Sequence, residues 1–461
     1  MLFIFATISF FIFCLKDLQK ALFFVLLATP LYLWRAKFFG LPTTFLEIMV
    51  LFCFVSWLWK KVKQKEKIEI KKVFGNYFFP VMSLLLFSFL AIFFSDEKVS
   101  ALGIWRAYFL EPIIFIFIFL EVFKKENILA KVILTLGYSS LFVSIPAIVQ
   151  KFTGWGIENT FWRDEATRRV VSWYGFPNAV GLFLAPIAVI YFGNLVNLLF
   201  EKVKNWRAIT FSIGVLFSSL LAIIFAQSEG AAIGVAAGCL LYSVVFILGL
   251  KPARRSCSNE GGSEETWLKK IKIIMAILPI IFAAFIFSVP QTRNYLIEKS
   301  TLSDRSGQIR KQMWLETWQM LKDGRILAGA GLDNYQTAIK KYHAEGIWLD
   351  KDQPDFKNKV TNDEKFRIEH WQPLEIYKYP HNIILNFWSE IGLLGSVSFL
   401  LIIFIFFYNY FNAGKENKKT RLILLSAVIA ILIHGLVDVP YLKNDLALLF
   451  FVFIFLNKNS F

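Results

Sequence analysis

The sequence predicts an all-α protein: a polytopic membrane helix bundle of 12–13 spans with one long extracytoplasmic loop that is partly helical. Composition is the first observation behind this prediction, because 56% of the 461 residues are hydrophobic and 18% are charged. Soluble domains average about 45–50% apolar residues and about 25% charged residues. The second observation is the presence of 12 or 13 long apolar runs, because a helix that spans a bilayer needs about 20 apolar residues. Because a backbone in lipid must satisfy its hydrogen bonds internally, these runs are expected to be helices.

The apolar runs set the order of the predicted spans. They lie near residues 1–15, 21–34, 43–59, 74–94, 104–122, 127–149, 177–198, 208–225, 229–250, 271–289, 383–410, 421–437 and 445–457. The first two are short for a bilayer, so they form a tight hairpin or one broken helix, which leaves the count at 12 or 13. The N-terminal run lacks a basic region and a small-residue cleavage site, and we expect it to be a retained helix.

Charge predicts the orientation of the bundle. The net charge is +16, from 50 basic and 34 acidic residues. The positive-inside bias explains this excess without a nucleic-acid partner, because Lys and Arg collect in cytoplasmic loops. The basic loops are 60–72, 123–126, 201–207, 251–272 and 415–421, and they fall on one side if each run spans once. The other side then receives 95–103, 150–176, 226–228, 438–444 and 290–380.

Three regions follow from this reading. Residues 1–289 hold membrane helices 1–10 with the basic loops, residues 290–380 form the long extracytoplasmic loop, and residues 381–461 hold the C-terminal helices. The long loop carries 15 basic and 13 acidic residues, too balanced for a polybasic lipid anchor. Apolar residues at helical spacing in 305–324 predict an amphipathic helix beside the membrane surface, which a glycine ends. The stretch 350–366 is predicted to be a polar loop.

The most informative candidate residues lie in 379–404. His381 and Asn382 occupy the first exposed turn of a predicted span, at its outer mouth. Asn382, Asn386 and Glu390 recur at every fourth position and predict a polar stripe that runs into the bilayer. Ionisable residues at depth are costly and normally serve a site. The alternative interpretation is an interfacial histidine and a helix-packing glutamate.

Arginine on the outer side is the second signal. Arg163, Arg168 and Arg169 lie among Trp and Tyr residues in 150–176, against the positive-inside bias, and Arg305 and Arg310 extend the pattern. Arginine forks bind phosphate with two hydrogen bonds. The cluster therefore predicts a site for a lipid diphosphate or a glycan, with interfacial anchoring by Trp and Arg as the alternative.

Other chemistry has weaker support. The four cysteines have no paired spacing, so neither a disulfide framework nor a metal site is expected, and no cofactor is implied. The pair Asp96-Glu97 alone supports a metal-dependent, polyprenyl-linked glycosyltransferase. The stretch 434–445 places His434, Asp438, Lys443 and Asp445 around one outer turn, as a structural lid or a wall of the site. Gly234 and Gly238 predict a helix-packing face.

These motifs resemble a known family. His381-Asn382-x-x-Leu385, followed by Glu390-x-Gly392-x-x-Gly395, is similar to the hallmark of the O-antigen ligase and O-antigen polymerase superfamily. Upstream, Arg310-x-x-x-Trp314 and the stretch 321–336 resemble that family's Arg and Trp before a Gly-x-Gly turn. The entry to a span at 175–186 and the stretch 434–445 are also similar, so that the likeness covers residues 75–455.

The resemblance implies a glycosyltransferase reaction that is metal-independent and inverting. A glycan would move from undecaprenyl diphosphate to an acceptor hydroxyl on a lipid, a glycan or a protein, at the outer face of the bacterial inner membrane. His381 would be the general base and Arg310 would stabilise charge on the departing diphosphate. The other residues that we expect to bind substrate are Arg168, Arg169, Arg305, Trp314, Asn382 and Glu390. Membrane lipids would surround the bundle.

One departure from the family pattern concerns the middle spans. The family usually has Ser-Arg-Gly there, with the arginine on the diphosphate, whereas this chain has Ser228-Glu229-Gly230. Arg168 or Arg169 could supply the missing charge. A flippase for lipid-linked oligosaccharide is the alternative from another class, and it should show repeated halves and charges along a central cavity. No such repeat is found in the sequence, and the ionisable residues gather at the outer mouth.

Overall fold

The computed structural model describes residues 2–38, 41–124, 128–201, 203–249, 298, 301–349, 351, 354–412, 414 and 418–456. The predicted span at 271–289 lies outside the described residues. Within them the all-α prediction is confirmed, because the strands are confined to two small antiparallel sheets. β1 (Arg35–Phe38) pairs with β2 (Leu41–Thr44), and β3 (Gly346–Trp348) pairs with β4 (Trp371–Pro373).

The helices follow the predicted runs closely. The N-terminal third contains α1 (Leu2–Lys16), α2 (Leu18–Leu27), η1 (Thr29–Leu33), α3 (Phe45–Gln64), α4 (Ile70–Phe74), η2 (Gly75–Tyr77), α5 (Phe78–Leu90), η3 (Ala91–Phe94), α6 (Lys98–Trp105), η4 (Arg106–Leu110), α7 (Glu111–Val122) and α8 (Leu129–Thr153). The middle contains α9 (Thr160–Arg163), α10 (Pro177–Leu199), α11 (Trp206–Ala226) and α12 (Glu229–Gly249). The remainder contains α15 (Arg305–Met320), η5 (Leu321–Arg325), α16 (Tyr335–Ile339), η6 (Lys340–Tyr342), α17 (Phe356–Asn362), α18 (Glu364–His370), α19 (Ile383–Asn412), α20 (Lys418–His434) and α21 (Asn444–Leu456).

In the described residues, seven helical stretches are long and apolar enough to cross a membrane. They are 70–94, 98–122, 129–153, 177–199, 206–226, 229–249 and 383–412. The chain is therefore a multi-pass membrane protein. The total of 12–13 spans stays a prediction, since α1, α2 and α21 are apolar but shorter.

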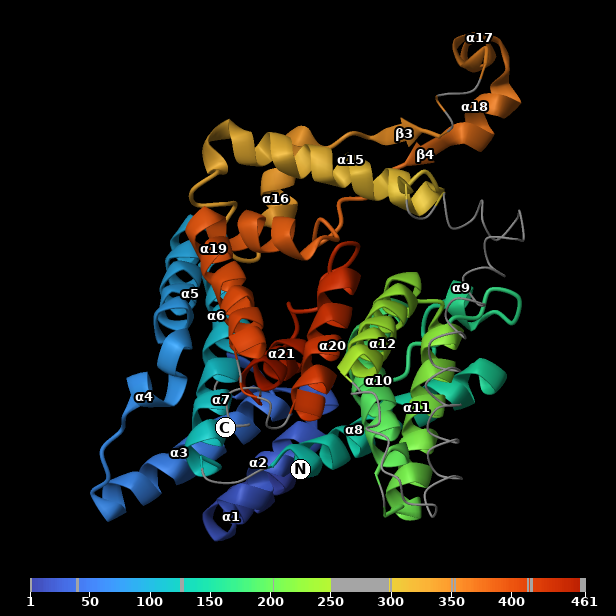
Figure 1. Ribbon diagram of the computed structural model, residues 1–461. Helices are drawn as coiled ribbons and strands as arrows, with labels where there is room; N and C mark the ends of the chain where they lie inside the picture. The colour runs from blue at the N-terminus through green and yellow to red at the C-terminus, as the bar shows by residue number, and fades with distance from the viewer. Residues whose placement is uncertain are drawn as a thin grey trace, which may run out of the picture.

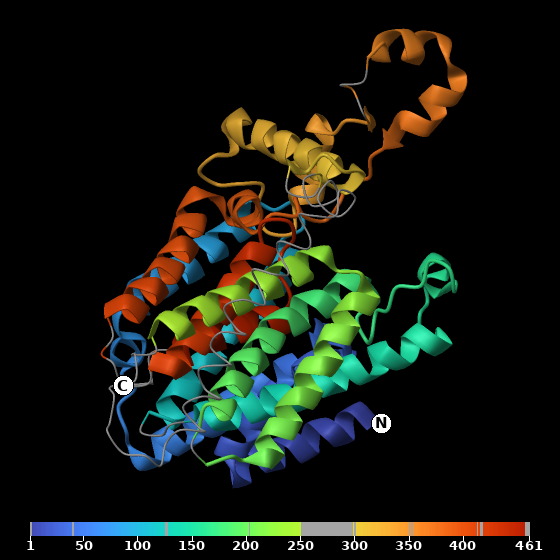
Figure 2. The same ribbon diagram turned by 45° about the vertical axis from the view of Figure 1, so that its right-hand side comes forward.

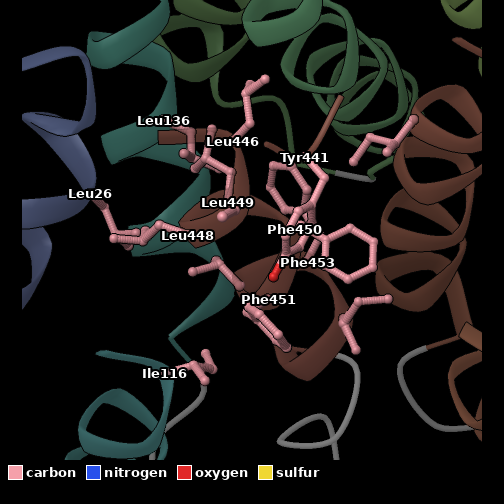
Figure 3. Close-up of a cluster of buried hydrophobic side chains, with 14 of the residues drawn as sticks. Leu26, Ile116, Leu136, Tyr441, Leu446, Leu448, Leu449, Phe450, Phe451 and Phe453 are labelled. Carbon is pink, nitrogen blue, oxygen red and sulfur yellow. The ribbon is translucent and has the colours of Figure 1, made fainter. Parts of the chain in front are cut away.

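The core of the bundle forms around α10 and α21. In α10, 83% of its most apolar 18-residue stretch is buried, and the helix packs against α8, α11, α12 and α20. α21 has 13 residues, all buried. Its Leu448 lies beside Leu26 of α2 (Figure 3). The predicted packing face of α12 is confirmed, because a Cβ on Gly234 or Gly238 would lie 2.7 Å from a backbone oxygen of α20.

The long loop segment covers one end of the bundle. α15 lies across that end, with α17 and α18 projecting beyond it, whereas α1, α2 and α3 lie at the opposite end (Figures 1 and 2). The predicted helix over 305–324 is confirmed as α15 and the π-helical turn η5. The polar loop predicted at 350–366 is wrong in part, since α17 and the start of α18 lie there. Asp363 caps α18 by accepting a hydrogen bond from the Phe366 amide, and the Phe366 ring stacks on His370.

Candidate active site

The helix that carries the His381 motif is broken at Gly392. This residue has φ 72° and ψ −179°, a conformation that glycine adopts without a Cβ penalty. The segment 383–391 lies across the end of the bundle beneath α15, and 393–412 then runs along the bundle (Figure 1). The prediction that the polar stripe descends into the bilayer is therefore wrong. Asn382, Asn386 and Glu390 all precede the break, so the backbone turns before the stripe can follow the span.

Two glycine motifs, distant in sequence, form one structural unit at this break. The amide of Leu393 donates to the carbonyl of Leu327 at 3.2 Å, and the amide of Ala330 donates to the carbonyl of Ser389 at 2.6 Å. A Cβ on Gly392 would clash with the carbonyl oxygen of Leu327. The Gly-x-Gly turn and the Glu-x-Gly helix are thus the two halves of a single backbone contact.

The carboxylate of Glu390 takes part in this contact. Its Oε2 accepts a hydrogen bond of 2.7 Å from the amide of Asp333, and the residue is only 4% exposed. Asp333 in turn lies 3.5 Å from the ammonium of Lys378. The geometry gives Glu390, which the sequence suggested as a substrate contact, a role in holding the 326–333 turn against α19.

The side chain of Asn382 also forms its hydrogen bonds with backbone groups. Its Oδ1 accepts hydrogen bonds from the amides of Ile384 and Leu385, at 3.0 and 3.1 Å, as an N-cap does. Its Nδ2 donates to the carbonyl of Leu436 at 3.1 Å. Asn382 therefore joins the start of α19 to the turn between α20 and α21.

His381 is held between two parts of the molecule. Its φ of 46° lies in the left-handed region, which non-glycine residues occupy only when their surroundings enforce it. On one side Trp314 of α15 donates from Nε1 to the carbonyl of Pro380 at 2.8 Å. On the other side the amide of Ile383 donates to the carbonyl of Gly435 at 2.7 Å. These two contacts hold the backbone on either side of His381.

The imidazole of His381 faces a buried carboxylate. Its Nδ1 lies 3.4 Å from Oδ1 of Asp438, and Nε2 of His434 lies 4.0 Å from the other carboxylate oxygen. Burial raises the pKa of Asp438, but the nearby imidazole of His381, together with His434 and the Val439 amide, holds that pKa below its ordinary value. Asp438 is thus an ionised partner that can orient the ring and stabilise its protonated form.

Asp438 links His381 to an arginine. The Nδ2 of Asn178, at the start of α10, donates to Oδ2 of Asp438 at 3.2 Å. The Nη2 of Arg169 donates to Oδ1 of Asn178 at 3.1 Å and to the carbonyl of Gln227 at 3.2 Å. Its Nε donates to the carbonyl of Ala226 at 3.0 Å. Four side chains from separate segments therefore form a continuous network: Arg169, Asn178, Asp438 and His381.

Arg169 lies at the position where the sequence departs from the family pattern. Its guanidinium bonds the two residues before Ser228 and interacts electrostatically with Glu229. Burial lowers the pKa of Arg169, and Glu229 opposes that shift. Arg168 instead donates to the carbonyls of Lys151 and Arg163, at 3.1 and 3.0 Å. Of the two arginines, the hydrogen bonds of the described residues join Arg169 to the network.

Two arginines of α15 were predicted to belong to the site, Arg305 and Arg310. Arg310 interacts electrostatically with His434 and with Tyr377, whose ring meets His381 edge to face at 5.5 Å. Burial, with a smaller contribution from Glu375, raises the pKa of Tyr377. Arg305 begins α15 and donates from Nε to the side-chain oxygen of Gln372 in β4.

A buried lysine completes this end of the bundle. Nζ of Lys443 lies 3.9 Å from the ring centre of Phe176 and 5.4 Å from that of Tyr174, and it has no hydrogen-bond partner among the described residues. Burial lowers the pKa of Lys443 to about 8, against the opposing charges of Asp445 and Asp438. The sequence suggested a lid or wall here, and the structure shows a charged wall beside Asp438.

Sequence reasoning missed the bridging role of Asn178 and the pairing of Asp438 with His381. The available signals were an Asn at the first turn of a span and the four-residue spacing of His434 and Asp438. Asp96 and Glu97 are exposed before α6, outside this network. Over the described residues, no group of three His, Cys, Asp or Glu side chains is placed to hold a metal ion.

The fold and the site together define a class: a multi-pass membrane protein with an imidazole–carboxylate pair and arginines at one end of its bundle. Residues 214–400 match the family model described as O-antigen ligase. This range includes Arg310, Trp314 and the Gly392 break, and it ends before Asp438. No protein of curated function matches the sequence. This match supports a glycan-handling membrane enzyme of the O-antigen ligase and polymerase type.

Proposed function

We propose that the protein transfers a glycan from undecaprenyl diphosphate to an acceptor hydroxyl. The observation that carries this proposal is the His381–Asp438 pair, which Asn178 links to Arg169 and whose neighbour His434 interacts electrostatically with Arg310. A glycosyl transfer needs a group to take the acceptor proton and positive charge to receive the departing diphosphate. The polyprenyl diphosphate is already an activated leaving group, so no nucleotide sugar is required.

The geometry supports a role for each group in this proposal. With Nδ1–H of His381 directed at Asp438, Nε2 keeps its lone pair and takes the proton of the acceptor hydroxyl. The acceptor oxygen then bonds to the anomeric carbon on the face opposite the diphosphate. The bond between that carbon and the phosphate oxygen breaks, and its electron pair leaves with the diphosphate. One displacement of this kind inverts the anomeric centre.

The leaving diphosphate would be received by arginine. Arg310 lies on the α15 side of the imidazole, and Arg169 lies on the α10 side. Nη1 of Arg169 makes no hydrogen bond within the described part of the chain, so it stays available to a phosphate oxygen. Guanidinium groups bind diphosphate oxygens strongly because the hydrogen bonds are charge-assisted. In this proposal Arg169 supplies the charge that Glu229 removed from the usual family position.

The proposed location is the outer face of the bacterial inner membrane. The positive-inside bias supports this orientation, because the predicted order of spans puts α15 and His381 on the side opposite the basic loops. A polyprenyl-linked glycan presented at that face would meet the His381 site directly. The acceptor is a hydroxyl on a lipid, a glycan or a protein. Accessibility labelling of a cysteine introduced in α15, with and without permeabilising the inner membrane, tests this orientation.

The decisive experiment is transfer by purified protein with a synthetic undecaprenyl-diphosphate oligosaccharide. Lipid A-core, a free glycan and a hydroxyl-bearing peptide are offered separately as acceptors. His381→Ala should lower the rate about 100-fold or more, whereas His370→Ala, a histidine on α18, should not. Equal transfer by both variants removes His381 from the mechanism. Retention at the anomeric centre, or loss of activity with chelator, would overturn the inverting, metal-independent reaction.

A further inference from the structure

A cavity of about 470 Å³ opens at the end of the bundle opposite α15. The turn between α1 and α2 forms one side of it, with Lys16 and Asp17. The C-terminal part of α3 forms the second side with Lys60 and Lys61, and the end of α7 forms the third with Glu121. The cavity therefore lies far from the His381 network, on the face with the basic loop 60–72.

The inner charges of the cavity are already paired. Nζ of Lys61 lies 2.6 Å from Glu66 and 2.6 Å from Glu121, and Lys124 also pairs with Glu121 at 3.3 Å. Asp17 pairs with Lys20 at 2.9 Å. These carboxylates are thus neutralised by lysines and do not repel an incoming anion strongly.

Two lysines at the rim remain available. Neither Lys16 nor Lys60 forms an ion pair within the described residues, although Lys60 attracts Asp17 at longer range. Lys16 ends α1, where a cation also faces the negative end of the helix dipole. Together they place two ammonium groups around a concave surface whose wall includes the buried ring of Trp57.

Apolar surface leads from the lipid side to these lysines. The exposed face of α1 consists of Phe5, Ile8, Ile12 and Leu15, and it ends beside Lys16. The exposed face of α3 consists of Leu51, Val55, Trp59 and Val62, and it passes Lys60. The two helices pack against each other, so both apolar rows approach the cavity rim. Acyl chains can pack against such apolar rows, whereas a free anion would make no contact with them.

The length of α1 gives a physical reason for a bound headgroup. A helix of 15 residues rises about 22 Å, which is less than the roughly 30 Å of the hydrocarbon core. A short helix thins the bilayer locally or draws flanking charges towards the headgroups. Lysines at the end of such a helix can therefore bind a lipid phosphate that lies closer to the bilayer centre than the other headgroups.

We propose that this cavity binds the phosphate of an anionic phospholipid, with Lys16 and Lys60 on the headgroup and the acyl chains along α1 and α3. Basic pockets between membrane helices bind such headgroups. The proposal is independent of glycan transfer. In the proposed orientation the lipid belongs to the inner leaflet.

The test uses full-length protein in detergent micelles and measures the thermal unfolding midpoint during titration with phosphatidylglycerol. Phosphatidylcholine and inorganic phosphate are titrated in parallel. The variants are Lys16→Gln/Lys60→Gln and the matched control Lys63→Gln/Lys67→Gln, which removes two exposed lysines of the same end that do not line the cavity.

Phosphatidylglycerol should raise the midpoint of the parent and of the control, and phosphatidylcholine should not. A surface lysine contributes about a fivefold factor to the affinity for anionic lipid, so the Lys16→Gln/Lys60→Gln protein should bind about 25-fold more weakly. Equal affinities for this variant and the control would overturn the site. An equal response to inorganic phosphate would show a soluble-anion site and overturn the lipid assignment.

Discussion

Replacing Asp438 with Asn removes the charge that faces His381 while keeping the shape of the side chain. The two groups lie 3.4 Å apart, and Coulomb's law with an effective dielectric of about 20 gives about 5 kcal/mol between a carboxylate and an imidazolium. This is an upper bound, because the His381 side chain keeps 26% of its surface exposed. A loss of about 3–4 kcal/mol would slow transfer about 10²–10³-fold. The effect arises because the imidazole becomes positive only as it takes the acceptor proton.

Single-turnover transfer at saturating donor measures this effect. If Asp438 acts through His381, the double variant His381→Ala/Asp438→Asn should be no slower than His381→Ala alone. Asp323→Asn is the matched control, because Asp323 pairs with Lys341 on the same face and away from the network. A transfer rate for Asp438→Asn within threefold of the parent, or fully additive effects in the double variant, would refute the reasoning.

The same variant has a defined effect on stability. The pKa of Asp438 is lower in the folded protein than in the unfolded chain, so its charge stabilises the fold above about pH 4, the unfolded value. That contribution is lost as the pH falls further. The difference in unfolding midpoint between the parent and Asp438→Asn should therefore shrink below pH 4, and a difference that grows in acid would contradict the assignment.

Arg169→Ala should raise the KM for the polyprenyl-diphosphate donor about tenfold or more, whereas Arg163→Ala should not change it; equal KM values would reject Arg169 as a donor contact. Gly392→Ala should cost about 3 kcal/mol or more of stability, because its φ of 72° and a carbonyl oxygen both exclude a Cβ. Gly214→Ala, with open space around the glycine, should keep the parent's denaturation midpoint, and similar midpoints for both would contradict this. The pKa of Lys443 is about 8 in the folded protein and 10.5 ordinarily. Between these pH values the unfolded chain holds a proton that the folded protein has lost, so the free energy of unfolding of the parent should rise by about 3 kcal/mol. Lys443→Met should lack that rise, and parallel curves of midpoint against pH would reject the buried charge.

The Gly392 break shows how the site combines motifs that are separately weak. Neither a Gly-x-Gly turn nor a Glu-x-Gly helix is informative alone. In the structure the turn fills the space that the missing Cβ of Gly392 leaves, and Glu390 anchors it through the amide of Asp333. The contact places α15 over the start of α19. Trp314 of α15 can therefore donate a hydrogen bond to the carbonyl of Pro380. The glycines therefore act on His381 through backbone packing.

The sequence alone determined the membrane class, most helix positions, the α15 helix and His381 as the candidate base. Hydropathy, helical periodicity and charge are local properties of a segment, and each can be read over about 20 residues without knowing the neighbours. The prediction that the polar stripe runs into the bilayer was wrong, because a distant turn enforces a positive φ at Gly392. The choice between Arg168 and Arg169 also depended on a distant partner.

Only the tertiary structure decided which side chains meet. Asn178 and Asp438 are 260 residues apart, and their contact depends on how α10 packs beside α20. Lys443 is buried because aromatic residues of another loop cover it. A single sequence carries no periodic signal for such pairings, because packing between helices is set by the shape of whole faces. The residues of the network could be named from the sequence in part, but their order as Arg169, Asn178, Asp438 and His381 came from the packing.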